Sequence, residues 1–141
     1  MTIFLDTSTI VAFLNKKDSR NSVAEKVMER IWENEFGRAI TTDYIADEAY
    51  TWLVSHTKEK SVLQSLFHFI HGNNENGYPK FIDVQFVTSE LYYQTWKLQE
   101  KYIDQNLSFT DLTTLIICSK HNVEYIASFD SDFDGLITRI S

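Results

Sequence analysis

Hydrophobic and polar positions alternate along the chain with two different periods. Short runs rich in β-branched and aromatic residues predict strands, and these cover residues 2–6, 38–42, 81–87, 123–130 and 135–140. Between them, hydrophobic residues recur every three or four positions, as on the buried face of an amphipathic helix. The helices predicted in this way cover residues 7–15, 19–34, 43–53, 59–71, 88–104 and 110–120.

Short polar side chains mark where three of these helices begin. Thr7 or Ser8 caps the first helix, because a side-chain oxygen at that position accepts a hydrogen bond from a free backbone N–H. Asp43 is expected to cap the third helix, and Thr88 or Ser89 opens the fifth. Each of these helices therefore starts directly after a predicted strand.

Two breaks interrupt the pattern without dividing it into domains. Gly37 ends the second helix, and the segment 72–79 contains the only proline and two of the four glycines. Strands separated by one or two helices favour a mainly parallel sheet with helices on both faces. We therefore predict an α/β protein, a three-layer α/β/α sandwich around a mainly parallel central sheet.

Composition supports one domain of this kind. The chain has 141 residues, 43% of them hydrophobic, which is enough for one sizeable core, and we expect residues 1–141 to form a single domain. Cys118 is the only cysteine, so an intramolecular disulfide is excluded. We find no secretion signal and no apolar run of about 20 residues. These observations predict a cytoplasmic protein with no membrane span.

The net charge of −7 restricts how the chain can bind nucleic acid. Proteins that bind nucleic acid by neutralising its phosphates are usually basic. Any nucleic-acid function must therefore be compatible with an overall acidic surface.

Four acidic residues fall where the predicted fold brings side chains together. Asp6 and Asp130 end two strands, and the carboxyl ends of parallel strands converge on one crevice. Glu48 lies on the predicted inner face of its helix, whereas Asp47 lies on the outer face. Asp111, in the first turn of its helix, borders the buried side. Four carboxylates from four separate segments are thus expected to point inward.

Each of these acids also has a simpler explanation. Asp43 and Asp111 can stabilise a helix N-terminus by about 0.3–1 kcal/mol, Asp6 can be a turn residue, and Glu48 can pair with a lysine. These explanations weaken when the acids are taken together, because two carboxylates 4 Å apart repel by roughly 1 kcal/mol in water and about 4 kcal/mol at an effective dielectric of 20. A divalent cation with oxygen ligands removes that repulsion. The pattern therefore predicts a metal site.

The types of ligand restrict the metal and the reaction. The four histidines show no zinc-ligand spacing, and one cysteine cannot form a structural zinc site. Carboxylates alone favour Mg²⁺ or Mn²⁺, and bound Mg²⁺ usually keeps waters and substrate phosphates as further ligands. The chain has neither a P-loop nor a dinucleotide-binding glycine motif. Phosphodiester hydrolysis is therefore favoured over nucleotide binding.

Four motifs follow one another along the chain: FLDTS, TTDYIADEAYTWL, LSFTDLTTL and IASFDSDFD. In this order they resemble those of PIN-domain ribonucleases, and specifically the VapC-type toxins of bacterial and archaeal toxin-antitoxin pairs. The likeness covers nearly the whole chain. It implies a Rossmann-like PIN fold and an endoribonuclease dependent on Mg²⁺ or Mn²⁺, which leaves a 5′-phosphate and a 3′-hydroxyl.

The resemblance also implies roles for individual residues. The catalytic metal ligands that it implies are Asp6, Glu48, Asp111 and Asp130, with Asp132 as an auxiliary. A hydroxyl beside the first acid, from Thr7 or Ser8, is expected to orient a ligand carboxylate or a bound water. One of the acids, Glu48 or Asp130, would also take the proton of the attacking water.

RNA contact and protein partners complete the hypothesis. Candidates for phosphate contact at the edge of the cleft are Lys16, Lys17, Arg20, Lys58 and Lys60. A solvated basic edge explains each of them at least as well. The resemblance implies two kinds of partner, a small antitoxin that places a basic side chain against the carboxylates and a second copy of the chain in a homodimer.

Two alternatives keep the same fold. The chain can be an RNA-processing or RNA-decay factor that has no antitoxin, or a non-catalytic module that docks a basic partner at its acidic cleft. A receiver-type signalling domain needs paired acids after the first strand, and a dehalogenase-type phosphatase needs a second aspartate where Ser8 stands. Neither of those two classes fits.

Overall fold

Five parallel strands form the centre of the molecule. The computed structural model describes all 141 residues, and its strands are β1 (Thr2–Leu5), β2 (Arg38–Thr42), β3 (Ile82–Gln85), β4 (Tyr125–Ala127) and β5 (Thr138–Ile140). They lie in the order β3-β2-β1-β4-β5, and every neighbouring pair is parallel. The chain moves from β1 outward to β3 and then returns to the other side of β1. This reversal creates a crevice at the carboxyl ends of β1 and β4.

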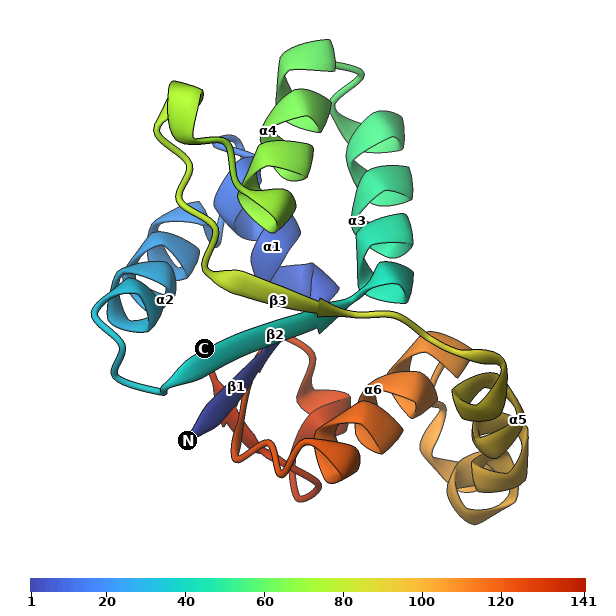
Figure 1. Ribbon diagram of the computed structural model, residues 1–141. Coiled ribbons are helices and arrows are strands. Elements are labelled where there is room, and N and C mark those ends of the chain that lie inside the picture. The colour runs from blue at the N-terminus through green and yellow to red at the C-terminus, as the bar shows by residue number, and fades with distance from the viewer.

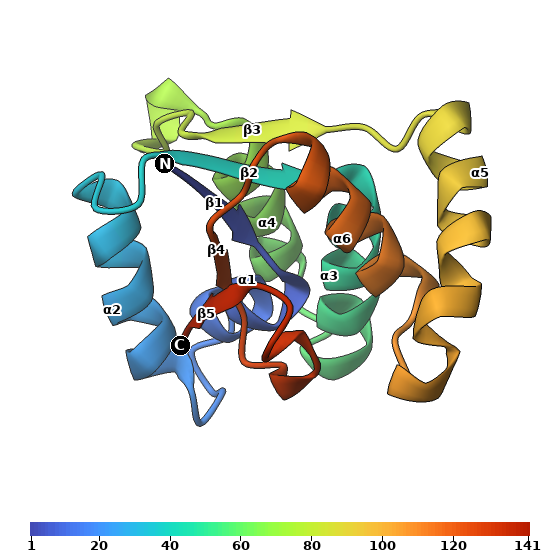
Figure 2. The same ribbon diagram turned by 90° about the horizontal axis from the view of Figure 1, so that it is seen from below.

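Six helices cover the two faces of this sheet. They are α1 (Thr7–Leu14), α2 (Asn21–Trp32), α3 (Asp43–His56), α4 (Lys60–His71), α5 (Ser89–Leu98) and α6 (Phe109–Lys120). The first four lie on one face, where α1 contacts α2, α3 and α4, and α5 packs against α6 on the other face (Figures 1 and 2). None of the helices combines the length and hydrophobicity that a membrane crossing requires. The predicted three-layer α/β/α sandwich is confirmed, and its sheet is entirely parallel.

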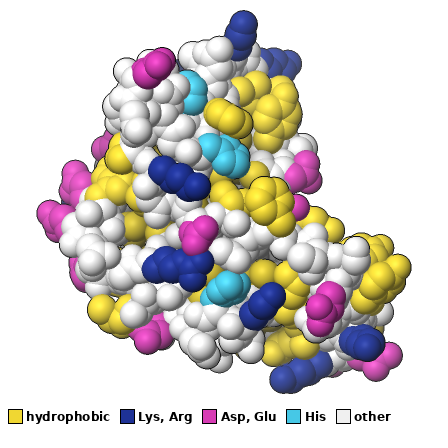
Figure 3. Space-filling view, viewed as in Figure 1, with side chains coloured by type: hydrophobic (Ala, Val, Ile, Leu, Met, Phe, Trp, Pro, Cys, Tyr) yellow, Lys and Arg dark blue, Asp and Glu magenta, His cyan; other side chains and the backbone are white.

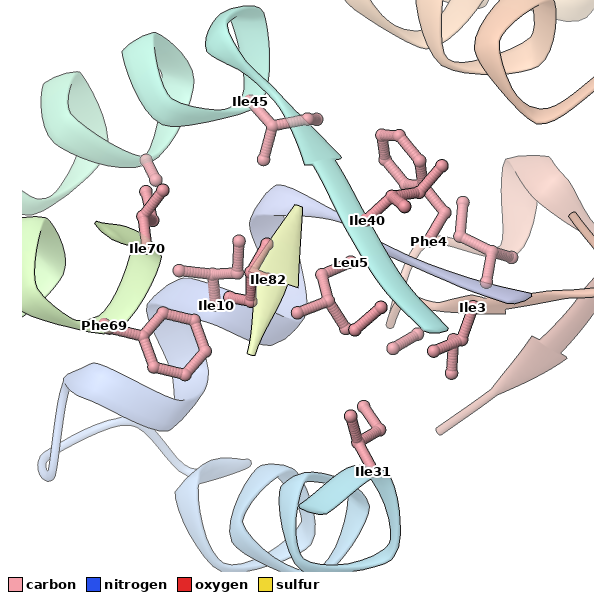
Figure 4. Close-up of a cluster of buried hydrophobic side chains, with 14 of the residues drawn as sticks. Ile3, Phe4, Leu5, Ile10, Ile31, Ile40, Ile45, Phe69, Ile70 and Ile82 are labelled. Carbon is pink, nitrogen blue, oxygen red and sulfur yellow. The ribbon is translucent and has the colours of Figure 1, made fainter. Parts of the chain in front are cut away.

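Hydrophobic side chains on both sides of β1 build the core. Ile3, Phe4 and Leu5 have no exposed surface, as expected for the central strand of a parallel sheet that is covered on both faces. Ile10 from α1 and Ile45 from α3 are equally buried and belong to the same cluster (Figure 4). The buried strand leads directly into residue 6, so the core holds the first predicted acid in a defined position.

Several predicted elements are shorter than their hydrophobic patterns suggest. β3, β4 and β5 are each shorter than the runs predicted at 81–87, 123–130 and 135–140. A strand of a sheet lasts only as long as its neighbour pairs with it, and β4 has partners only opposite residues 3–5 and 138–140. The helix predicted for 88–104 is α-helical only to Leu98 and continues as a 3₁₀ helix to Gln105. Most residues in this last stretch are exposed, so little packing supports an α-helix there.

Two of the predicted helix caps are wrong in an informative way. The N-cap of α1 is Asp6, which leaves Thr7 and Ser8 free to bond other side chains. The N-cap of α3 is Thr42, whose hydroxyl accepts from the N–H of Ile45, while Asp43 accepts from the N–H of Val87 instead. Asp43 thus ties the start of α3 to the end of β3.

The cap predicted for the fifth helix and the break at residue 37 are both found. Thr88 caps α5 through its side chain. Gly37 has a φ of +74°, and α2 ends a few residues before it at Trp32.

Replacing Gly37 with alanine should destabilise the sheet where β1 and β2 begin. A Cβ atom there would lie 2.3 Å from the carbonyl oxygen of Met1, in addition to the backbone strain of a positive φ, which costs about 1–3 kcal/mol. Gly77→Ala is the matched control, because φ is also positive at Gly77 (+75°) but no atom lies within 4 Å of the added Cβ. Urea unfolding should show a larger loss for Gly37→Ala, and equal losses would refute the steric argument.

Candidate active site

The carboxyl ends of β1 and β4 bring distant segments together. The N–H of Asp6 donates to the carbonyl oxygen of Ala127 at 3.1 Å, so residue 6 lies beside the segment that follows β4. α3 and α6 begin near the same edge of the sheet (Figure 1). A cavity of about 200 Å³ opens there, and its lining residues are Asp6, Thr7, Ser8, Val11, Arg20, Glu48, Trp52, Asp111 and Asp130. All four acids of the predicted set therefore line one cavity.

Asp6 is the most buried of these acids, with 4% of its surface exposed. Its Oδ2 accepts hydrogen bonds from Ser128 Oγ at 2.6 Å and from Ser8 Oγ at 3.2 Å. Burial raises the pKa of Asp6 from its ordinary value of 3.8 to about 6, the bond from Ser128 opposes this, and the negative charge of Asp111 adds to it. Keeping the carboxylate of Asp6 charged in the folded protein therefore costs free energy. A nearby cation would reduce that cost.

Sequence reasoning did not identify Ser128. Besides its bond to Asp6, its hydroxyl accepts from the N–H of Asp130 at 3.0 Å, and Ser8 accepts from the N–H of Phe129 at 2.9 Å. Two hydroxyls therefore connect the first acid to the segment that carries the fourth. The sequence feature that could have identified Ser128 is a hydroxyl residue at the end of a buried strand, two positions before an aspartate.

Glu48 reaches the cavity from α3 and is held by a single strong contact. Thr7 Oγ1 donates to Glu48 Oε1 at 2.7 Å. This bond agrees with the expectation that a hydroxyl beside the first acid orients a carboxylate. Asp47, the preceding residue, is exposed and does not line the cavity.

Asp111 caps its own helix and also lines the cavity. Its Oδ2 accepts from the N–H of Ser108 at 3.0 Å, while Ser108 Oγ accepts from the N–H of Asp111 at 3.0 Å, which is a capping box. The helix-capping explanation is therefore correct for one carboxylate oxygen. The other oxygen has no protein partner, and burial raises the pKa of Asp111, with the bonds to Ser108 opposing and the charges of Asp130 and Glu48 adding to the rise.

Asp130 lines the cavity, but its neighbour Asp132 does not. Asp130 Oδ1 accepts from the N–H of Asp132 at 2.9 Å and caps the 3₁₀ helix Ser131–Phe133. This turn leaves the side chain of Asp132 on the surface. The structure therefore does not bring the predicted auxiliary acid into the site.

Of the five predicted phosphate-contacting residues, only Arg20 lines the cavity. Lys16 and Lys17 have side chains that are 84% and 88% exposed and lie 3.6 Å and 3.9 Å from Glu25 and Glu59. Lys58 and Lys60 are also exposed, in and after the turn that joins α3 to α4. The four lysines thus lie on the surface, outside the cavity.

The cavity suits a hard divalent cation with an incomplete protein shell. Its acidic lining offers carboxylate oxygens without a lysine or histidine among them, and oxygen ligands are those that Mg²⁺ and Mn²⁺ prefer. No three acidic, histidine or cysteine side chains are placed to hold one ion together as they stand. The arrangement therefore fits an ion that keeps water or substrate oxygens among its ligands.

Comparisons with known proteins match nearly the whole chain. The family model of the PIN domain matches residues 3–136. The 23S rRNA-specific endonuclease VapC20 of Mycobacterium tuberculosis, from two strains, is 24% identical over 133 residues, which make up 94% of this chain and 92% of that protein. The crystal structure of VapC20 from the same organism, described as a sarcin-ricin loop cleaving toxin, superposes with a TM-score of 0.75 at 23% identity, covering 93% of this chain and 92% of the other. The resemblance drawn from the four motifs is thereby confirmed, and the chain belongs to the PIN domain family.

Proposed function

We propose that this chain is a VapC-type endoribonuclease that requires Mg²⁺ or Mn²⁺ and acts in the cytoplasm as the toxin of a toxin-antitoxin pair. The observation that carries the proposal is the convergence of four carboxylates, from four separate segments of a PIN domain, on one cavity. Burial raises the pKa of Asp6 and of Asp111, and the negative charges of other acids in the cavity add to both shifts. Such a cavity favours a cation, and a cation in turn attracts the phosphate of a nucleic acid.

In this proposal the acidic side chains have two roles in hydrolysis, which are to hold the ion and to accept a proton. Asp6 and Asp111 would hold the ion, and Glu48 and Asp130 would hold it directly or through water. When bound, the ion makes a coordinated water more acidic and neutralises charge that develops on the phosphate. Glu48 or Asp130 would take the proton of the attacking water, while Thr7 holds Glu48 in place. The water oxygen would bond to phosphorus as the bond from phosphorus to the 3′ oxygen breaks, and the 3′ oxygen would take a proton from solvent, which leaves a 5′-phosphate and a 3′-hydroxyl.

Cleavage of purified RNA tests this proposal. The name of the curated relative makes 23S rRNA the first substrate to try, followed by transfer RNA and messenger RNA. We expect discrete new ends in the presence of Mg²⁺ or Mn²⁺, with 5′-phosphates that a 5′-phosphate-dependent exonuclease digests, and no cleavage in excess EDTA. Cutting that persists in EDTA, or no cutting of any RNA with Mn²⁺, would overturn the proposal.

Replacing Thr7 with valine should slow this cleavage by about 10–100-fold, the usual effect of losing a group that orients a metal ligand. Valine keeps the shape of threonine but cannot donate to Glu48 Oε1. Initial rates should also fall for Glu48→Gln, whereas Asp47→Asn, on the exposed side of α3, should cut like the wild type. If Asp47→Asn were as damaging as Glu48→Gln, the assignment of the inner face of α3 would be wrong.

Two protein partners belong to the same proposal. An antitoxin would place a basic side chain against the carboxylates and so replace the cation. A homodimer would cover the aromatic surface of α5, where Tyr92, Tyr93 and Trp96 are 37%, 64% and 48% exposed, and hydrophobic side chains gather over this helix in Figure 3. Large exposed apolar areas of this kind mark interaction surfaces.

A further inference from the structure

Arg20 occupies a position that differs from that of every other basic residue in the chain. It is the only cation among the residues that line the acidic cavity. Its guanidinium carbon lies 4.9 Å from the centre of the Phe129 ring, which is the separation of a cation–π contact. Asp18 lies 3.5 Å from the Nε atom. The guanidinium therefore has Asp18 beside its Nε atom and the ring of Phe129 against one face.

The outer end of this guanidinium has no protein partner. The other arginines, Arg30, Arg38 and Arg139, each donate from Nε and from Nη2 to a carboxylate, those of Glu35, Asp83 and Asp134. Arg20 makes no such paired contact, and no hydrogen bond from either of its Nη atoms is formed. Its side chain is 45% exposed. The fork that normally binds a carboxylate or phosphate through two parallel bonds thus has no protein partner.

The anchoring of Arg20 is also tied to the catalytic acids. Phe129, on which the guanidinium rests, donates its N–H to Ser8, and the hydroxyl of Ser8 donates to Asp6. A substrate phosphate that enters the cavity meets four carboxylates, which repel it wherever their charge is not offset. A fixed cation in the cavity wall would attract the phosphate, whereas the acidic residues around it repel the phosphate.

We propose that Arg20 is the phosphate-binding residue of the active cavity, and that its open fork binds non-bridging oxygens of the RNA backbone beside the scissile bond. The inference rests on the proposed ribonuclease function and adds a named binding residue to it. Arg20 positions the strand and takes no part in the bond changes. The outer lysines, which are exposed and not anchored on a ring, do not share this role.

Steady-state kinetics on an RNA that the wild type cuts separates binding from chemistry. For Arg20→Gln we expect KM to rise at least about tenfold, the loss typical of a charge-assisted hydrogen bond, with kcat within about threefold of wild type. Arg20→Lys should recover part of the loss, because it keeps the charge but not the fork. Lys26→Gln, which removes an exposed charge of α2 outside the cavity, is the matched control and should keep the wild-type KM.

Salt dependence of RNA binding gives a readout that a purely structural role would not change. We would measure it with the Asp111→Asn protein in Mn²⁺, so that the RNA stays intact, with and without Arg20→Gln. Loss of one phosphate contact should reduce the slope of log K against log salt by about 0.7 for a single strand.

The outcomes distinguish the inference from the function on which it rests. A wild type that cuts RNA, together with an Arg20→Gln variant of unchanged KM and unchanged salt slope, would overturn the role of Arg20 alone. A wild type that neither binds nor cuts RNA would overturn the proposed function first.

Discussion

Replacing Asp111 with asparagine should reduce RNA cleavage by more than about 100-fold while the protein stays folded. Loss of a group that only orients a metal ligand already costs about 10–100-fold, so loss of a ligand itself should cost more. Asparagine keeps the shape of the side chain and a carbonyl oxygen that can accept from the N–H of Ser108, so the capping box of α6 is preserved. Initial rates on the same RNA, with circular dichroism as a check on folding, measure the effect.

Ser108→Ala is the control for the capping function of Asp111. It removes the hydroxyl that accepts from the N–H of Asp111 and should lower the free energy of unfolding by about 1 kcal/mol, the usual cost of a lost N-cap. Below the unfolding transition it should still cut RNA. An Asp111→Asn protein that cut at nearly the wild-type rate would show that Asp111 is only a helix cap.

Replacing Asp6 with asparagine should stabilise the metal-free protein by up to about 3 kcal/mol at neutral pH. The pKa of Asp6 is about 6 in the folded protein and has an ordinary value of 3.8, and a shift of about two units corresponds to about 3 kcal/mol. For a chain of this length, that is a rise of about 10 °C in Tm. Asparagine keeps an acceptor for Ser128 and Ser8, so the hydrogen bonds can remain.

The sign of the pH dependence follows from the same shift. Between pH 3.8 and pH 6 the folded protein binds more protons at Asp6 than the unfolded chain does, so the contribution of Asp6 to stability falls as pH rises through this window. Above it the penalty is constant. Thermal unfolding in EDTA from pH 4 to pH 8 should show this decline in the wild type and a smaller decline in Asp6→Asn. If Asp6→Asn were less stable than the wild type at pH 7.5 in EDTA, burial of an unpaired charge would not be the dominant property of this residue.

The fold was predictable because the hydrophobic pattern specifies both the elements and their order. β1 is buried on both sides, and its sequence is an unbroken hydrophobic run. Such a run is typical of a central strand that is covered on both faces. The ends of elements were predicted less well. The 3₁₀ continuation after Leu98 and the short β4 depend on packing and pairing with distant segments, which a local pattern does not contain.

The positions of the four acids were also predictable, because strand ends and helix faces follow from periodicity. The connections among them were not. Ser128 bonds Asp6 across 122 positions of sequence, and Arg20 lines the cavity with its guanidinium over the ring of Phe129, which lies 109 positions away. Asp132 shows the opposite case, since it is one of several acids in a short motif and the turn after Asp130 directs it to the surface.

Calorimetric titration of Mn²⁺ into the wild type and into Asp111→Asn tests the central claim most directly, since it asks for the cation site without any assumption about the RNA. Asp132→Asn, outside the cavity, is the control and should bind like the wild type. The account predicts saturable binding to the wild type, a dissociation constant at least about tenfold weaker in Asp111→Asn, and a stabilisation of the wild type by about 2.7 kcal/mol at 100 times the dissociation constant. Equal binding by the wild type and Asp111→Asn, or no binding to the wild type with and without a phosphate-containing RNA, would contradict it and favour a module that docks a basic partner at the acidic cavity.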